Sequence, residues 1–136
     1  MRDFKNILYA MDLDGEHFSS MVHALEFARR FTSRIHILYV NDPQAGYRHP
    51  ADHEDAVALK VKEAAPEFLL ENLDVVYAVS KGDTAGEIVQ YARENLIDLI
   101  IVGHKHRGKL YASMFDSTDV HVIDEAMLPI LVFPEM

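Results

Sequence analysis

Five short apolar runs mark the chain, and longer stretches with apolar residues every three or four positions separate them. The runs are rich in β-branched and aliphatic residues and cover Asn6 to Met11, Ile35 to Val40, Val75 to Val79, Leu99 to Gly103 and Ile130 to Phe133. Continuous apolar runs of this length are typical of strands that are buried on both faces. The pattern therefore predicts five strands.

The stretches between these runs predict helices. Apolar residues fall at helical spacing from Phe18 to Ala28, from Ala56 to Leu70, from Ile88 to Ala92 and from Val120 to Met127. Pro66 is expected to kink or divide the second helix, because proline lacks the amide hydrogen that a helix uses. Strands that alternate with helices require right-handed crossovers and a parallel sheet. The prediction is an α/β domain with a doubly wound sheet.

A parallel sheet of this kind binds ligands in the crevice beyond the carboxyl ends of its strands. Four stretches follow the first four strands, namely "AMDLDG", "VNDP", "SKGDT" and "GHKHRGK". In the first stretch, Asp12 could accept hydrogen bonds from a ribose hydroxyl or an adenine amino group, or it could cap the next helix. The residues themselves leave both roles open for Asp12, whereas Asp14 is better placed as a cap.

The stretch after the fourth strand holds the best anion site in the sequence. Gly103 and Gly108 allow the backbone to turn with its amides exposed, and Ser117 and Thr118 could offer hydroxyls and the first amides of a helix. The spacing lacks the lysine-threonine pair and the glycine positions of a Walker motif. A plain structural loop therefore stays an alternative to an anion site.

Composition narrows the classes of protein that fit. A chain of 136 residues, 49% apolar, predicts one domain over residues 1–136. The 22 acidic residues outnumber the 13 basic ones, and a net charge of -9 repels nucleic acid. The sequence has no cysteine and no apolar run near ~20 residues, so disulfides, thiolate chemistry and a membrane span are not expected. We expect a soluble cytoplasmic protein.

Groups for metal binding and catalysis are sparse. Eight histidines include His104 and His106, two apart, and His49 and His53, four apart. Pro50 argues against a helix that includes His49, and no third ligand is placed, so solvated histidines are favoured over a metal site. The chain also has no Gly-x-Ser-x-Gly elbow and no recognisable triad. The residues give no support to an enzyme.

Four segments carry a resemblance to a known family over nearly the whole chain. The segments "ILYAMDLDG", "IHILYVND", "GDTAGEIVQYARENLIDLIIVGHKHRG" and "DSTDVHVIDEAMLPILVFP" resemble the universal stress protein family. The resemblance implies a flavodoxin-like or Rossmann-like domain, with a five-stranded parallel sheet of order 3-2-1-4-5 and helices on both faces. It also implies a homodimer through the last strand, whose apolar segment "PILVFPEM" would be an aggregation hazard if it stayed unpaired.

The same resemblance marks a candidate nucleotide cleft. In nucleotide-binding members, Gly-x2-Gly-x9-Gly-Ser/Thr follows the fourth strand and holds the phosphates of ATP. Aligned from Gly103, the second glycine becomes His106, the third becomes Asp116, and the hydroxyl residue is Ser117. Asp12 and Val40 lie where members of the family hold adenine and ribose. The candidate cleft therefore consists of Asp12, Val40, Gly103, Gly108, Ser117 and Thr118.

Two substitutions weaken this cleft. His106 takes the backbone geometry of a glycine only with strain, and its ring enters the space of the phosphates. The Asp116 carboxylate, at about 4 Å from a phosphate charge, costs on the order of 4 kcal/mol, or ~10³ in affinity, unless a Mg²⁺ ion bridges the two. We expect a stress-response or regulatory protein that binds an unidentified protein partner, with no certain cofactor. The alternatives are an ATP-binding switch, possible with Mg²⁺, and a slow ATPase.

Overall fold

The computed structural model of the chain describes residues 3–11, 19–41, 54–105 and 125–135. Its elements are β1 (Asn6–Met11), α1 (Ser19–Arg30), β2 (Arg34–Asn41), α2 (Glu54–Ala64), α3 (Glu67–Leu70), β3 (Val75–Lys81), α4 (Thr84–Glu94), β4 (Leu99–Lys105) and β5 (Ile130–Glu135). All five predicted strands are confirmed, as are the first three predicted helices. Most of the helix predicted from Val120 lies outside the described residues.

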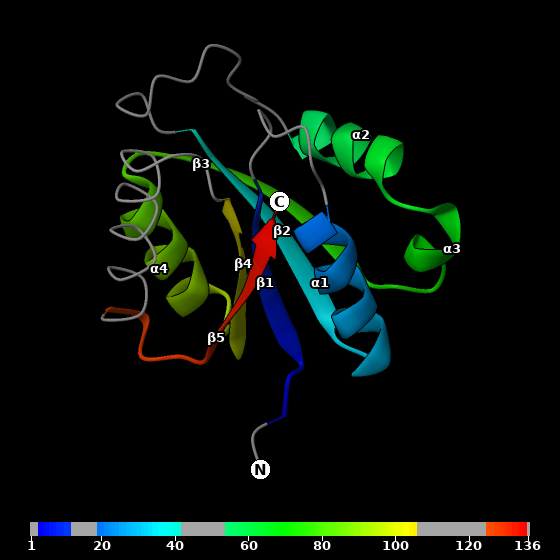
Figure 1. The fold of residues 1–136 in the computed structure, drawn as a ribbon. Coiled ribbons are helices and arrows are strands. Elements are labelled where there is room, and N and C mark those ends of the chain that lie inside the picture. The colour runs from blue at the N-terminus through cyan, green and yellow to red at the C-terminus, as the bar shows by residue number, and fades with distance from the viewer. Residues whose placement is uncertain (1–2, 12–18, 42–53, 106–124, 136) are drawn as a thin grey trace.

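The five strands form one parallel sheet in the order β3-β2-β1-β4-β5. This order confirms the one that the family resemblance implied. The first strand of the chain lies in the centre, and the winding direction reverses between β1 and β4. Figure 1 shows α1, α2 and α3 on one face of the sheet and α4 on the other. The doubly wound arrangement with helices on both faces is therefore confirmed.

Each face of the sheet has its own core, because successive residues of a strand point to opposite faces. On the first face, Ile7 and Ile37 pack with Leu25 of α1. On the second face, Leu8 and Leu38 are among the buried residues that pack with α4. Both faces of the central strands are thus covered.

The expectation that all five strands are buried on both faces is wrong for the two outer ones. Val75 to Ser80 of β3 are half-buried, and Val132 of β5 is 40% exposed. An outer strand has a neighbouring strand on one side only, so helices shield it less completely. Apolar composition alone does not distinguish an outer strand from a central one.

Local sequence signals set the helix boundaries. Pro66 separates α2 from α3, as predicted, and occupies the position just before α3. Asp83 caps α4, because its carboxylate accepts a hydrogen bond of 2.9 Å from the Gly86 amide. Past the end of α4, the Ile97 amide donates to the Ala92 carbonyl at 3.0 Å, which closes the helix end.

Candidate functional site

Two residues of the predicted cleft, Val40 and Gly103, lie at the carboxyl edge of the sheet. Val40 comes directly after Tyr39, which pairs with Met11 at the end of β1. Gly103 comes directly after Val102, and β4 lies on the other side of β1. The fold therefore brings these two residues to the same edge, on the two strands that flank β1, next to the point where the winding direction reverses.

The side chain of Val40 is covered by protein. Only 6% of Val40 is exposed, and it belongs to the core cluster that contains Ile88 and Val89 of α4. Val40 therefore acts mainly as an apolar floor beneath the edge, and it has little surface left for direct contact with a ligand. Beside it on β3, Ser80 has a buried hydroxyl that finds no hydrogen-bond partner among the described residues.

The β2–β3 side of the edge is closed by a glycine turn. The Gly82 amide donates a hydrogen bond of 3.0 Å to the Asn41 carbonyl, and Gly82 has a φ of 144°. A Cβ atom at this position would lie 3.2 Å from Cγ of Glu87. The positive φ of Gly82 therefore favours glycine here, and a Cβ atom would also require the Glu87 side chain to shift slightly.

The amino end of α4 opens at the same edge but is already capped. The carboxylate of Asp83 accepts from the Gly86 amide, so a carboxylate of the chain itself occupies the place where an anion would bind. Binding of phosphates at this edge would therefore depend on the segment after β4.

The other predicted cleft residues lie outside the described residues. These are Asp12, Gly108, Ser117 and Thr118, together with His106 and Asp116, which we predict to weaken the cleft. Their roles stay predictions. Within the described segments, no three histidine, aspartate or glutamate side chains gather as a metal ion would require.

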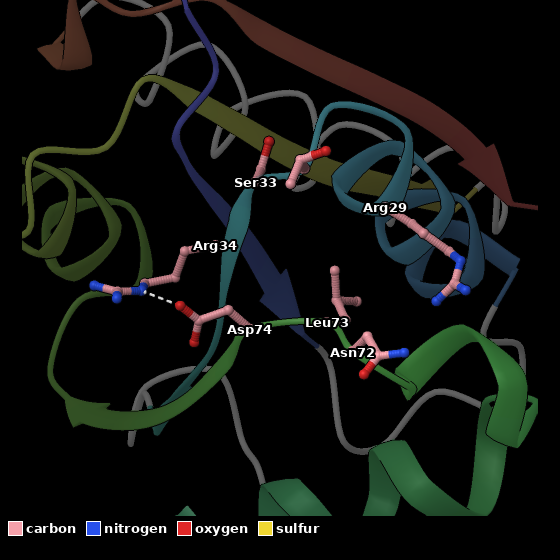
Figure 2. A pocket seen from close by; sticks show the side chains of 7 residues that line it. Arg29, Ser33, Arg34, Asn72, Leu73 and Asp74 are labelled. Carbon is pink, nitrogen blue, oxygen red and sulfur yellow. Dashed lines mark hydrogen bonds and ion pairs between the residues drawn. The ribbon is translucent and has the colours of Figure 1, made fainter.

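A separate pocket of about 540 Å³ opens at the opposite edge of the sheet, between the end of α1 and the start of β3. Its lining residues are Arg29, Thr32, Ser33, Arg34, Asn72, Leu73 and Asp74. Nε of Arg34 pairs with Oδ2 of Asp74 at 2.7 Å, and Nη1 of Arg29 donates to the Glu71 carbonyl at 2.7 Å. Figure 2 shows the two guanidinium groups on opposite sides of Leu73. They do not converge on one anion, so we assign no ligand to this pocket.

The burial of one histidine was not predicted from the sequence. The expectation of solvated histidines is wrong for His36, which is only 5% exposed and hydrogen-bonds to Tyr91 and Asn6. The signal was its position between Ile35 and Ile37, in the middle of an apolar run.

The strand order and the residues at the carboxyl edge define a doubly wound α/β protein of the flavodoxin type. The model of the universal stress protein family matches residues 3–134. The chain therefore belongs to the universal stress protein family, as the sequence segments indicated. This membership supports a role in stress response. Among the described residues, no helix has the length and apolarity that a membrane crossing requires.

Individual relatives agree with this assignment. The chain is 27% identical to a universal stress protein of Methanocaldococcus jannaschii over 141 residues, which cover 95% of this chain and 81% of that protein. Its fold is similar to that of the universal stress protein UspA of Lactobacillus plantarum, with a TM-score of 0.69, 21% identity and 96% and 97% of the two chains covered. A universal stress protein solved in complex with cAMP has a TM-score of 0.70, 16% identity and the same coverage.

Proposed function

We propose that this protein is a stress-response regulator that acts as a homodimer through contacts with other proteins and does not bind ATP tightly. The observation that carries the proposal is the free outer edge of β5. Among the described strands, β5 pairs with β4 alone, and it is apolar in the segment from Ile130 to Phe133. An unpaired apolar edge promotes aggregation, and pairing with a two-fold mate removes it.

Three features support weak binding of ATP. The sequence has His106 and Asp116 where nucleotide-binding members of the family have glycines. The start of α4 is capped by Asp83, and Val40 is buried in the core cluster to which α4 contributes. The carboxyl edge thus presents few free donors for phosphates among the described residues.

A nucleotide-binding switch is the second candidate function. A relative of similar fold was solved with cAMP. Within the described part of this chain, the buried hydroxyl of Ser80 beside Val40 has no hydrogen-bond partner. A ligand with a sugar hydroxyl could use such a group. Slow hydrolysis of ATP is a third and weaker candidate, since no described residue is placed to catalyse it.

The dimer is tested with a charge at the centre of the β5 edge. Val132→Asp introduces an acidic side chain at an exposed position of β5, and we expect it to convert the dimer to a monomer in sedimentation measurements. The matched control is Leu59→Asp on α2, where the side chain is 59% exposed on a helix that packs against β2 and β3. The control should stay dimeric. A wild-type monomer at tens of micromolar contradicts the proposed dimer.

Nucleotide binding is tested on the purified protein. Acid extraction followed by mass spectrometry identifies any adenine nucleotide that co-purifies, and calorimetry with ATP and Mg²⁺ measures its affinity. We expect no co-purified nucleotide and no measurable heat. Co-purified ATP or cAMP would favour the switch over the interaction protein.

A further inference from the structure

A partly buried network of polar groups joins α4 to β2 and to β1 at the centre of the sheet. On β2, Nδ1 of His36 lies 2.8 Å from the hydroxyl of Tyr91 on α4. Nε2 of the same ring lies 3.2 Å from Oδ1 of Asn6 on β1. The backbone amide of Asn6 in turn donates to Oδ2 of Asp98 at 2.9 Å. This network joins three elements, α4, β2 and β1, to Asp98, the residue just before β4.

The hydrogen bonds fix the protonation state of His36. The amide oxygen of Asn6 can only accept, so Nε2 carries a hydrogen and donates it. Burial raises the pKa of the Tyr91 hydroxyl, so that group stays protonated at neutral pH and donates to Nδ1. The ring is therefore neutral, with its single hydrogen on Nε2 and both nitrogens paired.

The surroundings of His36 disfavour a positive charge. Burial lowers the pKa of His36 below its ordinary value of 6.5, the nearby Arg34 lowers it further, and Asp74 acts in the opposite direction. Asp74 forms an ion pair with Arg34 at 2.7 Å, which limits how far the Asp74 carboxylate can raise the pKa of His36. The neighbouring strands contribute Leu8 and Val76 opposite His36, which are apolar.

We propose that His36 is an acid-sensitive lock between α4 and the sheet, and that its protonation loosens α4 while the rest of the sheet stays paired. A proton on Nδ1 turns the nitrogen from an acceptor into a donor. The bond to Tyr91 must then reverse, and the Tyr91 hydrogen must find another acceptor in a half-buried place. The apolar residues Ile88, Val89 and Ala92 of α4 also pack in the core on the α4 face of the sheet.

Because α4 begins at the carboxyl edge of the sheet, loosening of this helix would also affect that edge. Val40 belongs to the same core cluster as Ile88 and Val89 of α4, and the turn at Gly82 leads directly into α4. Loosening of α4 therefore uncovers the Val40 side of the edge. Acid would thus expose the Val40 side of the carboxyl edge without unfolding the molecule.

The direction of the pH effect follows from the lowered pKa. Between the unfolded value near 6.5 and the lower folded value, the loosened state binds more protons than the locked state. The stability that neutral His36 contributes is complete above pH 6.5 and is lost as the pH falls through this window.

Hydrogen exchange between about pH 7.5 and about pH 5.5, corrected for intrinsic exchange rates, tests the lock. We expect the amides of α4 to lose protection on acidification, and those of α1 to keep it. In His36→Gln, which cannot titrate, the extra loss in α4 should disappear. The control His23→Gln changes an exposed histidine on α1 and should behave as wild type. Equal loss of protection in α1 and α4 of the wild type would overturn the proposal.

If His36→Gln does not fold, a second measurement on the wild type tests the proposed lock. A nuclear magnetic resonance titration of the wild type follows the ring protons of its histidines, and the buried His36 is recognised by its contacts with Tyr91. We expect a midpoint below 6.5 for His36. A midpoint at or above 6.5 would show that the ring accepts a proton without cost, and no lock would remain.

Discussion

Several residues hold a backbone conformation that suits glycine better. Just after helices, Thr32, Asn72, Leu96 and Met127 have φ values of 53°, 60°, 53° and 58°. A left-handed conformation costs an L-residue about 1–2 kcal/mol, and glycine is the usual residue at such helix ends. The protein therefore tolerates strain at these helix ends that a glycine would relieve.

Leu96→Gly should raise the free energy of unfolding by about 1 kcal/mol, since relief of the left-handed strain exceeds the entropy cost of glycine. Leu96 is 78% exposed, so little apolar burial is lost. Urea unfolding measures the change. Leu96→Ala serves as the control and should not gain stability, because alanine retains the Cβ atom that causes the strain.

The predicted weak binding of ATP also depends on two single residues, His106 and Asp116. If His106 blocks the glycine turn and Asp116 repels the phosphates, then His106→Gly with Asp116→Gly should restore ATP binding by more than either change alone. The wild type should bind ATP no better than about millimolar. Calorimetry with and without Mg²⁺ measures all variants, and Asp12→Ala in the double mutant should abolish the gain. Micromolar binding by the wild type only with Mg²⁺ would instead make Asp116 a metal ligand.

The positions of some residues could be predicted from the sequence, and those of others could not. Val40 and Gly103 were correctly predicted at the carboxyl edge of the sheet, because each ends an apolar run and the runs were predicted to be parallel strands. The hydrogen bonds of His36 were not predicted, because its partners Asn6 and Tyr91 are 30 and 55 residues away in the sequence. Spacing along the chain carries no information on such distant pairs.

Among the elements, α4 depends on its cap. Asp83→Ala should destabilise the protein by about 1 kcal/mol, because the Gly86 amide loses its acceptor. Asp83→Asn retains a side-chain oxygen and should lose much less. Thermal or urea unfolding compares the two variants. Equal losses in both would mean that the charge of Asp83, and not its hydrogen bond, stabilises α4.

The elements themselves were largely predictable. Five apolar runs marked five strands, and Pro66 divided the second helix as its missing amide hydrogen requires. The exposure of β3 and β5 was not predictable from these runs. Exposure depends on the position of a strand in the sheet, and β5 is as apolar as the strands in the centre.

At the scale of the whole molecule, the proposed dimer makes stability depend on concentration. Because only the folded chain can pair through β5, the Tm of the wild type should rise with protein concentration. The Tm of Val132→Asp should stay constant over the same range. Scanning calorimetry at several concentrations makes the comparison, and a constant Tm for both proteins would argue that β5 does not pair.

The strand order came from the family resemblance. Alternation of strands and helices predicted a parallel doubly wound sheet but allows more than one order, so the segments that resemble the family were needed to choose 3-2-1-4-5. The candidate cleft was predicted in the same way. Its two described residues, Val40 and Gly103, lie at the carboxyl edge of the sheet, and their part in binding a ligand stays a prediction.

The central position of β1 also affects how the chain is made. The amide of Asn6 donates to Asp98, a residue 92 positions later, and Ile7 pairs with Leu99. The ribosome releases β1, β2 and β3 before β4. Until β4 is released, the side of β1 that pairs with β4 in the finished sheet has no partner strand. Nascent chains are then open to pairing with one another, and slow translation after β3 should increase co-translational aggregation. The strand at the centre of the finished sheet is an edge strand for most of its synthesis.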